Sequence, residues 1–99
     1  MKVSEVNISF IKPINGQIGF ASIVINDELY LSSIAVHQKL HRPGEYRITY
    51  PTKLVGSQFQ QIFHPINKQA ALAIEHAILT KLKDVMNHDR YYRYTDTIA

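Results

Sequence analysis

The chain contains no cysteine and no tryptophan, and its four glycines are scattered singly. Without cysteine there is no disulfide framework, no thiolate zinc site, no iron–sulfur cluster and no cysteine nucleophile. No apolar run follows the first lysine, and no stretch approaches the roughly 18 uninterrupted apolar residues of a membrane span. We therefore expect a cytoplasmic protein that makes no use of a membrane.

The residues that are present suit one small globular domain. The chain has 99 residues, of which 45% are hydrophobic and 19% charged, a composition typical of folded proteins rather than disordered ones. Eleven Lys and Arg stand against eight Asp and Glu, which gives a formal net charge of +3. This mild excess permits an anionic partner without requiring one.

The first two thirds of the chain has the patterns of β-strands. Apolar and polar residues alternate over residues 6–10, with the period of a half-buried strand. Asn15-Gly16 suits a tight hairpin turn, and Gln17–Ile25 would be the returning strand. Apolar residues lie on both faces of this second strand, so we expect it to be central and buried on both sides. Further strands are expected at residues 28–36, 46–50 and 59–63, with a polar loop at residues 37–45.

After Asn67, a good N-cap, the apolar period becomes that of a helix. Apolar residues between positions 71 and 86 fall within an arc of about 160°, which predicts an amphipathic helix on a sheet, ending near Asn87-His88. Glu75 lies inside this arc and either extends to water or makes an ion pair or interface contact.

These patterns predict an α+β fold. We expect a small mixed or antiparallel β-sheet of four to five strands with one long C-terminal α-helix packed on it. Residues 1–88 would form the single domain, and residues 89–99 an Arg- and Tyr-rich tail. Open sheet edges favour a homodimer, because pairing of edge strands would cover them.

No group of residues has the spacing of a catalytic or metal site. His37 and His41 are four residues apart, but a Pro-Gly turn nearby argues against the helix that would align them as ligands. No serine lies in a nucleophile elbow, and there is no phosphate-binding glycine loop. His64 precedes a proline and is expected to bond a backbone carbonyl. We therefore expect no enzyme, no catalytic residue, no metal, no cofactor and no small-molecule substrate.

Positive charge is concentrated between residues 37 and 53. Four Lys and Arg face a single Glu there, so this stretch alone accounts for the net charge of +3. Lys and Arg neutralise phosphates, and the interleaved Tyr46 and Tyr50 could stack on bases. The alternative is a solvated loop and edge strand whose cations discourage aggregation. Residues 90–94 have the same chemistry, but their tyrosines could equally pack on the sheet or on a second subunit.

Several short elements occur in the order and spacing of one known family. The sequence resembles the SpoVG family, also called septation protein or stage V sporulation protein G, from about residue 3 to residue 85. The matching elements are Ala21-Ser22-Ile23, Ile34-x-Val36, Tyr50-Pro51-Thr52-Lys53 and Ile62-Phe63-His64-Pro65-Ile66-Asn67. The His-Pro-Ile step into the helix is the most specific of them.

The resemblance implies a bacterial, homodimeric regulator that binds DNA or RNA in sporulation and septation. Lys53 matches a family lysine associated with nucleic-acid contact. The predicted nucleic-acid contacts are Lys39, Arg42, Arg47, Tyr50, Thr52 and Lys53, with Arg90 and Arg93 in the tail.

The sequence also departs from the family at four positions where members carry basic residues. These positions are Asn7, Ser9, Ala35 and Leu54. The departures keep open a second reading, a non-catalytic protein-interaction module of the same fold with weak or no nucleic-acid binding.

Overall fold

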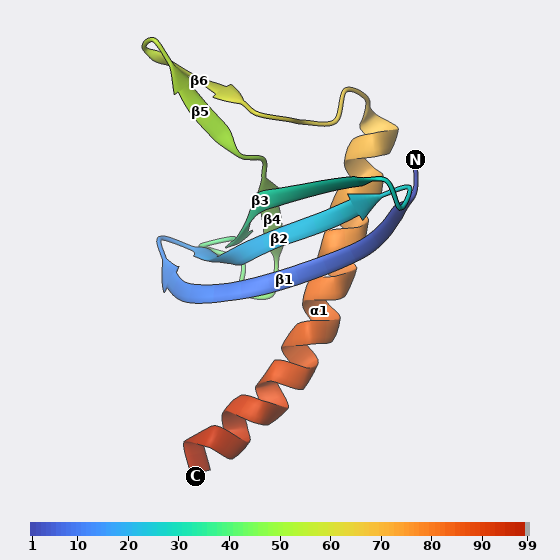
Figure 1. The fold of residues 1–99 in the computed structure, drawn as a ribbon. Coiled ribbons are helices and arrows are strands. Elements are labelled where there is room, and N and C mark those ends of the chain that lie inside the picture. Colours follow the sequence, from blue (N-terminus) through green and yellow to red (C-terminus); the bar gives the residue numbers. More distant parts are fainter. Residues whose placement is uncertain (99) are drawn as a thin grey trace.

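The computed structural model describes the backbone of residues 1–98 and the side chains of residues 1–87. Six strands precede one helix (Figure 1). The elements are β1 (Val3–Ile14), β2 (Gln17–Ile25), β3 (Leu29–Gln38), β4 (Tyr46–Thr49), β5 (Thr52–Val55), β6 (Gln58–Gln61) and α1 (Lys68–Ile98).

The first four strands form one antiparallel sheet in the order β1-β2-β3-β4. Asn15 and Gly16 have φ of 51° and 88°, as the predicted hairpin turn requires. Asn26 and Asp27, with φ of 54° and 56°, make a second turn of the same kind between β2 and β3. Two tight turns in succession explain why β1, β2 and β3 lie side by side in chain order.

The helix α1 passes behind this sheet and covers one of its faces (Figure 1). The fold is therefore α+β, as predicted. The core lies between these two layers, and its fully buried side chains come from β2, β3 and α1. They are Ala21, Ile23, Ile34, Val36, Ile74, Ile78 and Leu82.

The prediction that β2 is central is confirmed, but the prediction that it is buried on both faces is wrong. Ala21 and Ile23 point into the core, whereas Phe20, which lies on the opposite face of β2, is 38% exposed. Within residues 1–98 no element covers that side of the sheet. The reason lies in the neighbouring strands, which place Ser9 and Asn7 beside the outward residues of β2. We call this uncovered side the open face.

The second sheet is a hairpin of β5 and β6 that projects away from the rest of the molecule (Figure 1). We call residues 52–61 the arm. Every residue of both strands is exposed. The expected strand at 59–63 appears as β6, whereas β5 was not predicted. Pro51, directly before β5, marks the corner at which the chain leaves the main sheet.

The helix begins as predicted and continues further than predicted. The backbone N–H of Ala70 donates to Oδ1 of Asn67 at 2.7 Å, which confirms the N-cap. The expected end near Asn87-His88 is wrong, because α1 extends to Ile98. No Gly or Pro interrupts residues 68–98, so neither of the two residue types that most strongly disfavour helix is present there. No helix in residues 1–98 is long and apolar enough to cross a membrane.

Gly19 allows β1 and β2 to approach closely at their register shift. A Cβ at this position would overlap the carbonyl oxygen of Ser9 and come within 3.2 Å of the Cα of Phe10. We expect Gly19→Ala to lower the free energy of unfolding by about 1–3 kcal/mol, because backbone must move to admit the methyl group. Urea unfolding followed by circular dichroism measures this loss. The exposed Ser32→Ala should change stability by less than about 0.5 kcal/mol, and equal values for the two variants would contradict the steric argument.

Candidate nucleic-acid interface

The loop between β3 and β4 brings two of the predicted cations together. The backbone N–H of Lys39 donates to the carbonyl of Glu45 at 2.9 Å, and that of Glu45 donates to Arg42 at 3.0 Å. Oε2 of Glu45 then lies 3.5 Å from Nζ of Lys39 and 3.7 Å from Nη1 of Arg42. The three side chains are exposed, so these ion pairs add little stability. Their main effect is to offset part of the positive charge of the loop.

Arg47 lies on β4, directly after this loop, and its side chain is exposed on the open face. It pairs across the strands with His37, whose Nε2 lies 2.9 Å from Oγ1 of Thr49. Burial and the guanidinium of Arg47 lower the pKa of His37. At neutral pH His37 is therefore neutral, and Arg47 supplies the positive charge at this place on the sheet.

Thr52 and Lys53 lie on the arm, at the opposite end of β4 from the loop (Figure 1). Lys53 is exposed and pairs across the hairpin with Gln60. The strand β4, which carries Arg47 as its second residue, spans about 13 Å between the loop and the arm. The structure therefore joins Lys39, Arg42 and Arg47 in one group and leaves Lys53 apart from them.

The ring of Tyr50 packs against other side chains and does not present an open face on which a base could stack. Its ring meets that of Phe63 edge-on, with centroids 5.8 Å apart, and both pack against the core. Burial, and then the negative charge of Glu75, raise the pKa of Tyr50. Tyr46 is also half-buried against the core. Glu75 itself is exposed, which agrees with the interpretation that its side chain extends to water.

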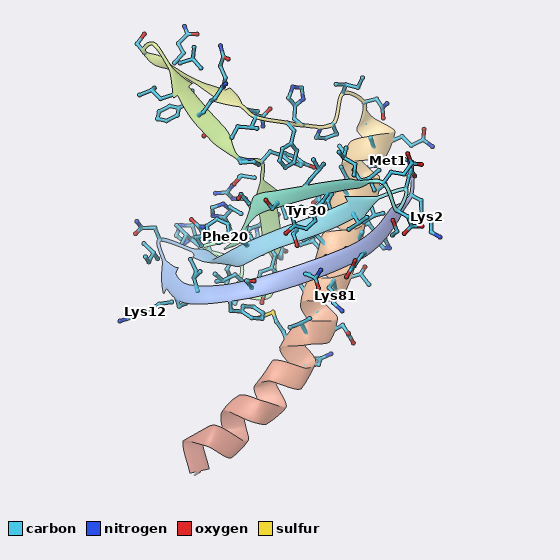
Figure 2. All side chains as sticks on the ribbon, viewed as in Figure 1. Met1, Lys2, Lys12, Phe20, Tyr30 and Lys81 are labelled. Carbon is cyan, nitrogen blue, oxygen red and sulfur yellow. The ribbon has the colours of Figure 1, made fainter. Side chains whose placement is uncertain are left out.

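The exposed aromatic rings of the main sheet are Phe20 and Tyr30, which sequence reasoning did not select. Both lie on the open face, on the side of the sheet away from α1 (Figure 2). Phe20 was missed because β2 was expected to be buried on both faces. A usable signal was present in the alternate serines and asparagine of β1, β2 and β3, since such residues suit a face in contact with water.

Two other predictions concern residues away from this surface. Nδ1 of His64 lies 2.9 Å from the carbonyl oxygen of Pro65, the kind of backbone bond predicted for it. The side chains of Arg90 and Arg93 lie outside the described residues, so their predicted contacts remain predictions. Within the described part of the chain, no three His, Asp or Glu side chains are grouped to hold a metal ion.

The fold and this surface define a small α+β protein with one helix-backed sheet, a basic loop and a projecting arm. No family model matches the sequence. A protein from Phytoplasma australiense that is named as a septation protein SpoVG is 33% identical over 91 residues. The alignment covers 89% of this chain and 90% of that protein. The chain therefore belongs to the SpoVG family, whose name describes septation and no chemical reaction.

Proposed function

We propose that this protein is a bacterial, cytoplasmic regulator that binds DNA or RNA as a homodimer in sporulation or septation. Family membership supports a function of the SpoVG type. Nucleic-acid binding is supported by the surface described above, where the cations are exposed and Lys and Arg side chains can neutralise phosphates. The homodimer rests on the exposed apolar surface of the arm.

The position of Arg47 is the observation that carries the nucleic-acid proposal. Its side chain is exposed, it stands next to the basic loop, and no ion pair is found for it among residues 1–87. An arginine in this situation can bind a phosphate bidentately without first breaking a protein contact. Lys39 and Arg42 would add charge beside it, reduced by Glu45. Lys53 would give a second contact from the arm.

The arm supports the homodimer because its two faces differ in chemistry. Leu54 and Phe59 are a cross-strand pair on one face, and Lys53 and Gln60 are the neighbouring pair on the other. A two-stranded hairpin alone is at best marginally stable in water, so an arm with exposed apolar residues calls for a partner. In a two-fold dimer each subunit would cover the other's apolar pair. The Lys53 face would stay open to phosphates.

Binding to fluorescein-labelled duplex DNA and single-stranded RNA tests this proposal, with anisotropy read at about 50 and 200 mM salt. We expect affinity to fall steeply with salt as phosphates exchange cations, by about 10²-fold or more for four phosphates per dimer. Arg47→Glu should weaken binding at low salt by about tenfold or more and reduce the salt slope by about two per dimer. Lys2→Glu is the matched control, since it makes the same charge change at the other end of the sheet.

Two outcomes would sink the nucleic-acid proposal. One is affinity that does not depend on salt, and the other is equal binding by the Arg47→Glu and Lys2→Glu variants. Either result would favour the interpretation that this SpoVG-type domain contacts a protein partner instead.

A further inference from the structure

We propose that the open face of the sheet is a stacking platform for single-stranded nucleic acid, with Phe20 and Tyr30 as the base-contacting residues. This inference rests on the proposed function, because it assigns the site at which unpaired bases would bind. It concerns the part of the open face beyond Arg47, to which the proposed function assigns no contact.

The two rings project from neighbouring strands on the same side of the sheet (Figure 2). Phe20 is 38% exposed and Tyr30 is 64% exposed. Tyr30 pairs with Val24, which shares a face with Phe20 because alternate residues of β2 point the same way. Planar rings standing on a sheet can receive base faces, and this stacking tolerates any base sequence.

Between the rings lies a shallow hollow of about 240 Å³ with a polar but uncharged lining. Besides Phe20, Tyr30 and Ala21, it is lined by Asn7, Ser9, Ser22, Ser32 and Ser33. Hydroxyl and amide groups both donate and accept hydrogen bonds, so they can meet the edge of a base placed between the rings. Among the described residues no carboxylate lines the hollow itself. The carboxylate of Glu5 lies next to it, where it accepts a hydrogen bond from the lining residue Asn7.

A β-bulge shapes this hollow. The β2–β3 register shifts between Ala21 and Ile23, so that Ser32 and Ser33 together oppose Ser22. Ser33 has a φ of 65°, a conformation that a non-glycine residue rarely adopts. A bulge of this kind interrupts the ladder and redirects side chains, and it occurs often beside functional sites. Here it places extra polar groups at the centre of the open face.

The charges along the open face favour one end for phosphates. Arg47 stands at the end nearest the basic loop, one strand beyond His37. Glu5 stands towards the opposite end, where its Oε1 accepts a 3.3 Å hydrogen bond from Nδ2 of Asn7. A strand of nucleic acid could therefore run from the loop past Arg47 to Phe20 and Tyr30. In a duplex the faces of the bases are covered by neighbouring bases, so the platform would select unpaired strands.

The test compares anisotropy binding of a single-stranded RNA, the matching single-stranded DNA, their duplexes and an abasic strand of equal length. The variant is Phe20→Leu combined with Tyr30→Ser, which keeps apolar volume at the half-buried site. Stacking on an aromatic ring contributes a factor of about ten per base, so we expect a loss of about tenfold to 100-fold for both unpaired strands. Duplex affinity should change less than about twofold. The abasic strand should bind the wild type and the variant alike.

Leu29→Ser is the matched control, because Leu29 is an exposed apolar residue adjacent to Tyr30 on the other face of β3. Thermal unfolding of all variants verifies the fold. Equal losses for single strands and duplexes would overturn the platform, as would an unchanged preference for strands that carry bases. A change of oligomeric state in the Phe20 and Tyr30 variant would instead assign the face to a second copy. If the wild type binds neither form, the proposed function fails as well.

Discussion

Replacing Ile78 with alanine is expected to lower the free energy of unfolding by about 3–4 kcal/mol. Ile78 is 0% exposed and lies on the α1 side of the core, opposite the buried residues of β2 and β3. Truncation removes three buried carbons and leaves a cavity between two rigid layers, which cannot close completely. A domain of this size has few other apolar contacts with which to offset the loss.

Urea unfolding measures this effect at fixed protein concentration, because the stability of the proposed dimer would depend on concentration. Leu72→Ala is the matched control: it lies on the same helix but is 54% exposed. Alanine favours helix as well as leucine does, so this variant should lose less than about 1 kcal/mol. Similar losses for the two variants would mean that the core does not lie where the sheet meets α1.

Replacing Phe59 with aspartate is expected to raise the dissociation constant of the proposed dimer by about 10²-fold to 10³-fold. The ring is 74% exposed in the single chain and pairs with Leu54 on the apolar face of the arm. An aromatic anchor at an interface typically contributes about 2 kcal/mol or more, and two-fold symmetry applies each substitution twice. The added carboxylate would also need to be desolvated.

Sedimentation velocity over a range of micromolar concentrations reads this change directly. Gln60→Asp is the matched control, because it adds the same charge on the opposite face of the same strand. We expect the Gln60 variant to sediment as the wild type does. A Phe59→Asp protein that remains fully dimeric, or a wild type that is monomeric, would contradict a role for the arm in assembly.

Local sequence patterns were sufficient for the elements that depend on near neighbours. The turn at Asn15 and Gly16 follows from two residues that tolerate positive φ, and the start of α1 follows from the side-chain oxygen of Asn67. The change from a period of two to a helical period likewise distinguished the strands from the helix. Each of these depends on interactions within about four residues, which the sequence contains directly.

The end of α1, the strand β5 and the exposure of Phe20 depended on more distant parts of the chain. The strand β5 begins directly after Pro51, where the chain leaves β4 and enters the arm. The sequence favours burial of Phe20 because its own strand is apolar, yet within residues 1–98 no second layer covers that face. Whether an apolar residue is covered depends on which element packs against it, and no window of sequence contains that information.

The candidate nucleic-acid interface likewise has some features that the sequence determines and others that only the tertiary structure determines. The sequence by itself determined that positive charge is concentrated in residues 37–53, because charge is a property of residue type. Only the tertiary structure decided that Glu45 offsets Lys39 and Arg42, that Lys53 stands apart on the arm, and that Arg47 shares a face with two exposed rings. Those relations are set by strand register and by the path of the chain through space, which bring together residues that are distant in sequence.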